Sequence, residues 1–215
     1  MKYTTVLFDL DGTLVDSGIG VTNSVAHALE RFGITPPPRQ ELFKFIGPPL
    51  TQSFCEFCGF DDEQTTLAIK YYREYYSEKG ILECSMYDGV LELLKYLKGK
   101  GYKLSLATSK PEIYATRVVE NKGILKYFDY IAAASTDEKT RATKEAVIDY
   151  ALDICEEKDR RKIIMIGDRH FDINGARAFN LDSIGVTFGY GDRKELEAAG
   201  ATYIVDSMKE IGKVL

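Results

Sequence analysis

The chain has 215 residues, of which 45% are hydrophobic and 28% are charged, and its formal net charge is -5. These proportions are typical of a globular protein, and the negative charge argues against a nucleic-acid-binding surface. No apolar run approaches the roughly 20 residues that span a bilayer, and a strand pattern begins almost at the N-terminus, where a signal peptide would lie. We therefore expect a cytoplasmic protein that binds neither nucleic acid nor membrane.

The first predicted element is a buried strand that ends in two acids. The apolar residues 6–8 lead directly into Asp9-Leu10-Asp11-Gly12-Thr13, and so apolar a run is typical of a parallel strand covered on both faces. The acids then stand at the C-terminal end of the strand, where open α/β sheets bind their ligands. Two neighbouring carboxylates repel each other, so the pattern favours a bound cation, although Asp-Gly alone is also common in turns.

A long helical stretch follows this strand. Ser17 is a candidate N-cap for a helix whose apolar residues recur at helical spacing from Val21 to Phe32. Further helices are predicted around residues 42–46, from 50 to 58, and from 61 or 62 to 80, and no strand pattern interrupts them. This stretch therefore predicts an all-helical insertion.

From Val90 onward, predicted helices and strands alternate. The strands cover residues 104–107, 128–132, 163–166, 183–186 and 201–205. Helices are predicted from 90 to about 98, from 111 to about 123, from 144 to 154, from 173 to 178 and after the last strand. Such alternation indicates a parallel sheet with helices on both faces. We predict an α/β fold with a Rossmann-like, doubly wound parallel sheet as the core domain (residues 1–15 and 85–215) and a helical cap domain (residues 16–84).

Further polar residues stand at strand ends or at the start of a helix. Thr108 and Ser109 follow the strand at 104–107, and Lys144 opens a helical pattern. Asp168 follows the strand at 163–166, and Asp172 lies four residues later. With Asp9 and Asp11, these residues resemble, in order, the four motifs of the haloacid dehalogenase superfamily of phosphotransferases. The resemblance covers nearly the whole chain, and the helical insertion is similar to the C1 cap of that superfamily.

The resemblance implies a phosphatase that depends on Mg²⁺ and hydrolyses a small phosphomonoester through an aspartyl-phosphate. Asp9 would be the nucleophile, and Asp11 would protonate the leaving alcohol and then accept a proton from water. The side chains of Asp9 and Asp168 and the backbone carbonyl of Asp11 would bind Mg²⁺, which prefers a few protein oxygens together with water and phosphate.

The phosphate ligands implied by the resemblance are Thr108, Ser109 and Lys144, which would stabilise charge on the transferred phosphoryl group. Lys139 and Arg141 are close rivals of Lys144 in sequence, and Lys110 is a reserve candidate.

Asp172 is expected beside the metal ligands rather than among them. An acid in the first turn of a helix is also favoured by the helix dipole, so its position has a second interpretation.

The substrate is expected to contact the cap. The best candidate is a rigid loop between two predicted helices, formed by Gly47, Pro48, Pro49 and Leu50. Arg73 and the neighbouring tyrosines 71, 72, 75 and 76 are open alternatives, because such residues more often form a cap core or a solvated surface.

Three functions compete for this pattern. The first is hydrolysis of a small phosphorylated metabolite that resembles phosphoglycolate, a sugar phosphate or a nucleotide. The second is a β-phosphoglucomutase-like isomerase, which Thr13 and Val21 disfavour because those mutases usually carry an apolar residue and a cap histidine there. The third is a non-enzymatic phospho-accepting receiver module, which is usually shorter and has no helical insertion. We expect a monomer or a weak homodimer.

Overall fold

The computed structural model describes residues 2–135 and 140–215. In this part of the chain, six parallel strands form one sheet in the order β5-β4-β1-β6-β7-β8. The strands are β1 (Thr5–Phe8), β4 (Lys103–Pro111), β5 (Tyr130–Ala134), β6 (Ile163–Gly167), β7 (Asp182–Val186) and β8 (Tyr203–Val205). The predicted α/β fold with a doubly wound parallel sheet is confirmed.

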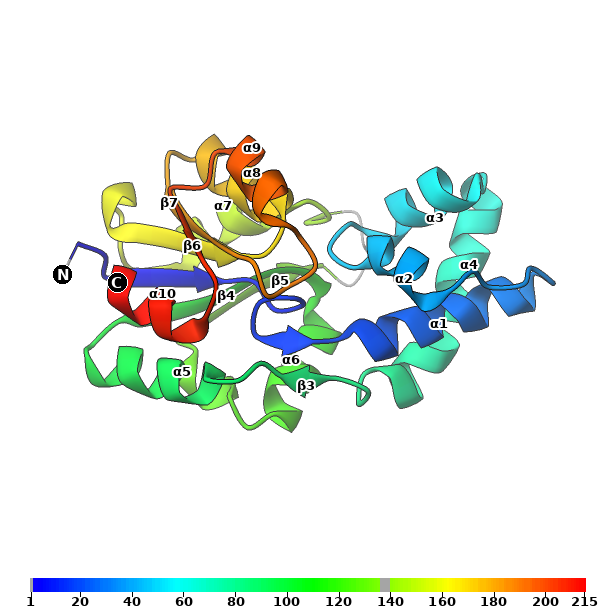
Figure 1. The fold of residues 1–215 in the computed structure, drawn as a ribbon, viewed down its shortest axis with the longest axis horizontal. Coiled ribbons are helices and arrows are strands. Elements are labelled where there is room, and N and C mark those ends of the chain that lie inside the picture. Colours follow the sequence, from blue (N-terminus) through cyan, green and yellow to red (C-terminus); the bar gives the residue numbers. More distant parts are fainter. Residues whose placement is uncertain (1, 136–139) are drawn as a thin grey trace.

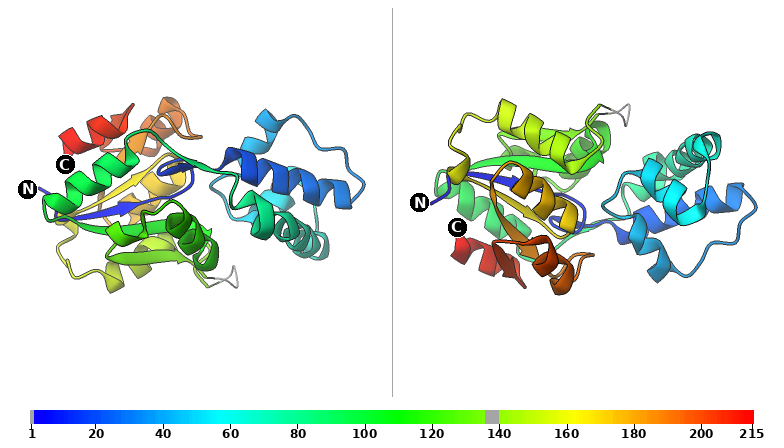
Figure 2. Two further views of the ribbon diagram at one scale, coloured as in Figure 1. Left: turned by 90° about the horizontal axis from the view of Figure 1, so that it is seen from below. Right: turned by 90° about the horizontal axis from the view of Figure 1, so that it is seen from above.

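Strand β1 lies in the middle of the sheet because both of its faces are apolar. Val6 and Phe8 face one hydrophobic core, and Leu7 faces the other. The first core is covered by α5 (Val90–Gly99), α6 (Glu112–Asn121) and α10 (Met208–Val214). The second is covered by α7 (Lys144–Ile154) and α8 (His170–Ala178), and the two layers of helices flank the sheet in Figure 2.

Several element boundaries differ from those predicted. Strand β5 begins at Tyr130 rather than at residue 128, and β4 continues through Thr108 to Pro111. Helix α9 (Arg193–Ala199), in which Leu196 and Ala199 are the buried residues, was not predicted. Such a short helix offers too few apolar positions for a periodic signal.

The helical insertion lies at one end of the elongated molecule, on the right of Figure 1. The chain enters it through β2 (Val15–Asp16) and leaves it through β3 (Ser85–Met86), and these two strands pair antiparallel. Between them lie α1 (Gly18–Arg31), α2 (Arg39–Leu42), a 3₁₀ turn (Phe43–Phe45), α3 (Leu50–Cys58), α4 (Asp62–Tyr75) and a π-helical turn (Tyr76–Gly80). The division at residues 16 and 84 into two domains stays a prediction.

The start of α1 differs from the predicted cap. Ser17 stands at the N-cap position, but its side chain makes no capping hydrogen bond. The backbone N–H of Gly18 instead donates to Asp16 Oδ1 at 3.0 Å. Asp16 also accepts a 2.6 Å hydrogen bond from the hydroxyl of Tyr190, so the entry to the insertion is tied to the core.

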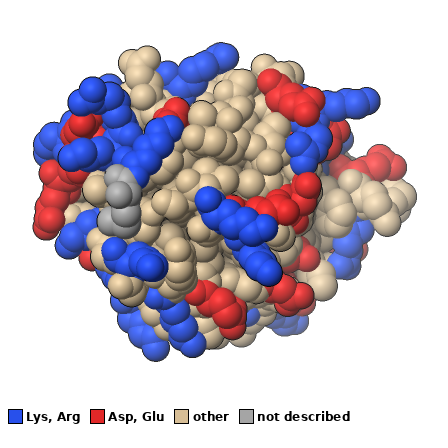
Figure 3. All heavy atoms as spheres, turned by 60° about the vertical axis from the view of Figure 1, so that its left-hand side comes forward, with Lys and Arg blue, Asp and Glu red and all other residues tan. Residues whose placement is uncertain are grey.

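None of the described helices has both the length and the apolar character to cross a bilayer. On the face drawn in Figure 3, Lys and Arg side chains are interspersed with Asp and Glu. The absence of a nucleic-acid partner, like the monomeric or weakly dimeric state, stays a prediction.

Candidate active site

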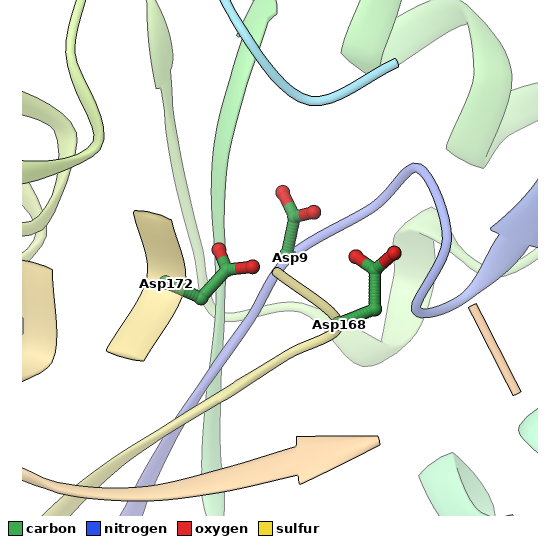
Figure 4. A group of neighbouring side chains, drawn as sticks. All are labelled: Asp9, Asp168 and Asp172. Carbon is green, nitrogen blue, oxygen red and sulfur yellow. The ribbon is translucent and has the colours of Figure 1, made fainter. Parts of the chain in front are cut away.

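Three acids, of which Asp9 and Asp168 were predicted at strand ends, converge at the carboxyl edge of the sheet. Asp9 follows β1, Asp168 follows β6, and Asp172 lies in the first turn of α8. Figure 4 shows their side chains gathered at this edge, and one carboxylate oxygen of each lies within 4.8 Å of the others. All three residues are buried, with at most 6% of their surface exposed. We call them the three-acid group.

The electrostatics of the three-acid group fit a divalent cation. Burial raises the pKa of Asp9 to about 6, although the Lys144 ammonium opposes this rise. Burial and the charges of Asp172 and Asp9 raise the pKa of Asp168 well above its usual range. A bound cation would offset the repulsion between these carboxylates. Carboxylate oxygens are the ligands that Mg²⁺, Ca²⁺ and Mn²⁺ prefer.

Two glycines allow the acids to approach each other. A Cβ atom on Gly12 would lie 2.2 Å from Asp168 Oδ2, and one on Gly167 would lie 2.1 Å from Asp172 Cγ. Gly12 also has a φ of +86°, which L side chains rarely adopt. The glycines that flank the acids in sequence are therefore required by the packing of the site.

Asp168 is held by two groups from other parts of the chain. Its Oδ2 accepts a 2.8 Å hydrogen bond from the backbone N–H of Tyr190, and the Thr13 hydroxyl lies 3.4 Å from its Oδ1. Tyr190 was not predicted as a site residue, because a backbone donor leaves no side-chain signal. The flanking Gly189 was a possible hint, since a Cβ there would lie 2.4 Å from Asp168 Cβ.

Lys144 lies beneath the acids rather than in the open site. Its Nζ atom contacts Asp9 Oδ1 at 2.7 Å, Asp172 Oδ1 at 2.8 Å and the carbonyl oxygen of Ala107 at 3.0 Å. The contacts with Asp9 and Ala107 are hydrogen bonds, and the contact with Asp172 is an ion pair, so the ammonium group is turned toward the acids and β4. Of its rivals, Arg141 binds the Ala133 carbonyl and Glu112, and Lys139 lies outside the described residues.

The contacts of Asp172 fit an acid in the first turn of a helix, and its place beside the metal ligands rather than among them stays a prediction. Its Oδ2 accepts a 3.1 Å hydrogen bond from the backbone N–H of Arg169, as expected for an acid in the first turn of a helix. Its Oδ1 pairs with Lys144, and the side chain belongs to the three-acid group.

We expect Lys144→Met to destabilise the fold by about 3–5 kcal/mol, because removal of one partner leaves buried carboxylates without a counter-charge. Urea unfolding in the presence of a chelator measures this loss. Lys126→Met is a matched control, because Lys126 is exposed. A loss as small as that of the control would show that Lys144 does not hold the acids together.

Asp11 does not belong to the three-acid group. Its Oδ2 lies 2.6 Å from Lys110 Nζ, and its Oδ1 is buried without a hydrogen-bond partner among the described residues. Asp11 and Asp9 are thus close in sequence but pair with different lysines, and only Asp9 also lies beside two further acids.

A cavity lies between the edge of the sheet and the helical insertion, with an empty volume of about 770 Å³ that includes open solvent at its mouth. The loop predicted to contact the substrate, residues 47–50, lies in the wall of this cavity. The carbonyl oxygen of Ile46, the residue before this loop, accepts a 2.9 Å hydrogen bond from Arg169. The core contributes Asp9, Asp11, Thr108, Ser109, Lys110, Pro111, Tyr114, Ala134 and Ala142, and the insertion contributes Val21, Phe45, Ile46, Gly47, Pro48, Pro49, Leu50, Tyr72 and Arg73.

A doubly wound sheet with clustered acids at its carboxyl edge and a helical insertion over the cavity is the architecture of a phosphoryl-transfer enzyme. The family model described as haloacid dehalogenase-like hydrolase matches residues 6–186. The chain therefore belongs to the haloacid dehalogenase-like hydrolases, and the resemblance stated from the motifs is confirmed.

Relatives match along the whole chain. A 5'-nucleotidase of Pseudomonas aeruginosa is 39% identical over 215 residues, which cover 100% of this chain and 96% of that protein. The tyrosine-protein kinase PtkA of Mycobacterium tuberculosis is 36% identical over 95% of this chain and 71% of its own length. The crystal structure of a protein described as a predicted phosphatase from Clostridium acetobutylicum has a TM-score of 0.95 and 47% identity, with 100% and 98% of the two chains covered. The chain is a phosphoric monoester hydrolase of this family.

Proposed function

We propose that the protein is a phosphatase that depends on Mg²⁺ and hydrolyses a small-molecule phosphomonoester through an aspartyl-phosphate on Asp9. One observation carries this proposal. Asp9 lines the cavity and also belongs to the three-acid group, so one carboxylate can face a substrate and a metal ion together. Asp9 and Asp168, with the backbone carbonyl of Asp11, would hold the ion.

The reaction has two steps. In the first, an oxygen of Asp9 forms a bond to phosphorus while the ester P–O bond breaks and leaves its electron pair on the leaving oxygen. Asp11 gives a proton to that oxygen. In the second step Asp11 takes a proton from the water whose oxygen bonds to phosphorus, while the bond between phosphorus and the Asp9 oxygen breaks, its electron pair returns to the Asp9 carboxylate and inorganic phosphate is released. Bound Mg²⁺ would supply positive charge to the phosphoryl oxygens and to the acids.

Thr108 and Ser109 are well placed to receive the phosphoryl oxygens. Both line the cavity on the extended end of β4, beside the strand that carries Asp9. The Thr108 hydroxyl accepts a 3.2 Å hydrogen bond from the backbone N–H of Lys110, so its own proton is left to donate. Fixed donors of this kind stabilise the charge of a phosphoryl transition state.

The aromatic part of the cavity wall favours a leaving group with a flat apolar face. Phe45, Tyr72 and Tyr114 line the cavity, and apart from Asp9 and Asp11 no described lining residue carries a carboxylate or an amide. Sugar hydroxyls that lose water need such polar partners, whereas a base can stack on aromatic rings. These features support a nucleoside monophosphate, in agreement with the name of the Pseudomonas aeruginosa relative.

The test is phosphate release in the presence of Mg²⁺ from nucleoside 5'-monophosphates, phosphoglycolate and glucose 6-phosphate. We expect the highest kcat/KM with a nucleotide. Tyr114→Leu removes one ring of the wall, so it should raise KM for the nucleotide about 10-fold and leave phosphoglycolate unchanged. A preference for phosphoglycolate or the sugar phosphate would contradict this choice of substrate.

The mutase alternative has its own test. Val21, where the mutases usually carry a histidine, lines the cavity and has no group that could move a proton. We therefore expect β-glucose 1-phosphate to give free phosphate and no glucose 6-phosphate, measured with a coupled dehydrogenase assay. Sustained formation of glucose 6-phosphate would favour the mutase function over hydrolysis.

A further inference from the structure

We propose that Lys110 is a further catalytic residue, whose ammonium group stabilises the negative charge that develops on the leaving-group oxygen. This role rests on the proposed function, in which Asp11 serves the same oxygen. It differs from the role of a phosphate ligand, for which Lys110 was a reserve candidate.

The position of Lys110 is the first observation. Its Nζ lies 2.6 Å from Asp11 Oδ2, and its side chain is 8% exposed. Lys110 lines the cavity together with Asp9 and Asp11, two residues after Thr108 on the end of β4. A nearly buried cation is thus held against the acid that faces the leaving group.

The surroundings of Lys110 strengthen the electrostatic effect of its ammonium group. The Nζ atom lies 5.0 Å from the centroid of the Tyr76 ring, which is buried and stacks on Tyr72 with 5.3 Å between centroids. Aromatic rings attract a cation but replace little of its hydration, and charge acts more strongly where water is excluded. The ring pair therefore keeps the ammonium group near Asp11.

Lys144 cannot take this role from its present position. Its ammonium group donates to Asp9 and to the carbonyl of Ala107 and pairs with Asp172, and Lys144 does not line the cavity. Of the two lysines, Lys110 is therefore the one that can reach a bound ester.

The first chemical step places the leaving oxygen near Lys110. As the Asp9 oxygen bonds to phosphorus, the ester P–O bond breaks, its electron pair stays on the leaving oxygen, and the proton comes from Asp11. Asp11 Oδ1, which has no hydrogen-bond partner among the described residues, is the oxygen available for this transfer. The single bond to Asp11 Oδ2 does not exhaust the three donors of an ammonium group, so Lys110 can also donate to the leaving oxygen.

The experiment compares leaving groups of different basicity. For Lys110→Met we expect kcat to fall about 10²–10³-fold with an alkyl phosphate or a nucleoside monophosphate, the usual effect of removing one preorganised donor. With p-nitrophenyl phosphate we expect little change, because its leaving oxygen carries less charge. Lys110→Arg keeps the charge and should recover part of the loss.

Three comparisons make the result decisive. Lys98→Met removes another lysine that lies 2.6 Å from an acid, Asp129, but Lys98 does not line the cavity, so its effect should not depend on the leaving group. If Lys110→Met does not fold, as judged by circular dichroism, Lys110→Gln and Lys110→Arg carry the comparison. If the loss of kcat in Asp11→Asn does not depend on the leaving group while the loss in a Lys110 variant does, the proposed role of Asp11 is wrong and that of Lys110 is supported. Equal losses with all esters, together with a higher inhibition constant for inorganic phosphate, would overturn the proposal.

Discussion

Asp9→Asn is expected to abolish turnover. Asparagine keeps the shape of the side chain, and its amide oxygen can still accept the hydrogen bond from Lys144, so the fold should persist. The amide is not a nucleophile, however, and removal of a nucleophile costs about 10⁶-fold in a hydrolase where the loss has been measured. We expect a loss of at least about 10⁴-fold in kcat and no phosphoenzyme.

Rapid-quench labelling with a ³²P-labelled substrate, followed by peptide mapping, measures the phosphoenzyme directly. The wild type should carry the label on Asp9, and beryllofluoride should attach there as a phosphate analogue. Asp149→Asn is a suitable control, because Asp149 is an exposed acid on α7. Label on Asp11 in the wild type, or undiminished label in Asp9→Asn, would show that the nucleophile is assigned wrongly.

Removal of divalent metal is expected to have a comparably large effect. Without a cation, the buried three-acid group repels the phosphoryl group as well as itself, so a chelator should stop turnover and added Mg²⁺ should restore it. Mg²⁺ should also raise the Tm, since a ligand at 100 times its Kd stabilises the folded state by about 2.7 kcal/mol. Calorimetry with and without Mg²⁺ therefore gives a readout that is independent of activity.

The affinity for the metal should depend on pH. Because burial raises the pKa of Asp9 to about 6, protons compete with the metal for this carboxylate as the pH falls through that value. Mg²⁺ should therefore raise the Tm less at pH 5 than at pH 8. Asp168→Asn should reduce the shift at both values, whereas Asp149→Asn should not. Full activity in a chelated, metal-free buffer would refute the dependence on metal.

The sequence predicts where the central strands and helix α7 lie, because the apolar runs of these elements are unambiguous. Residues 6–8 and 163–166 are apolar throughout, and the structure buries both β1 and β6 completely. Lys144 opens a helix with a regular apolar stripe, and α7 begins at this residue. Polar residues at the ends of such elements are therefore located well by pattern alone.

The contacts within the site could not be predicted in the same way. Lys144 lies between Asp9 and Asp172, which are far apart in sequence, and no local pattern encodes that distance. The pairing of Lys110 with Asp11 depends on the continuation of β4 past Thr108, where its register with β5 shifts. Both features follow from tertiary packing.

The central position of β1 has a consequence for the order of folding. Thr5 pairs with Lys103 and with Ile163, which follow it by about 100 and 160 residues, and such distant pairings form slowly. Helices α1 and α4 instead pack on each other within the insertion and can form early. During synthesis, β1 is made first but has an open edge until β6 emerges. An unpaired apolar edge is a template for intermolecular pairing, so the time before β6 appears is when the chain is most prone to aggregate.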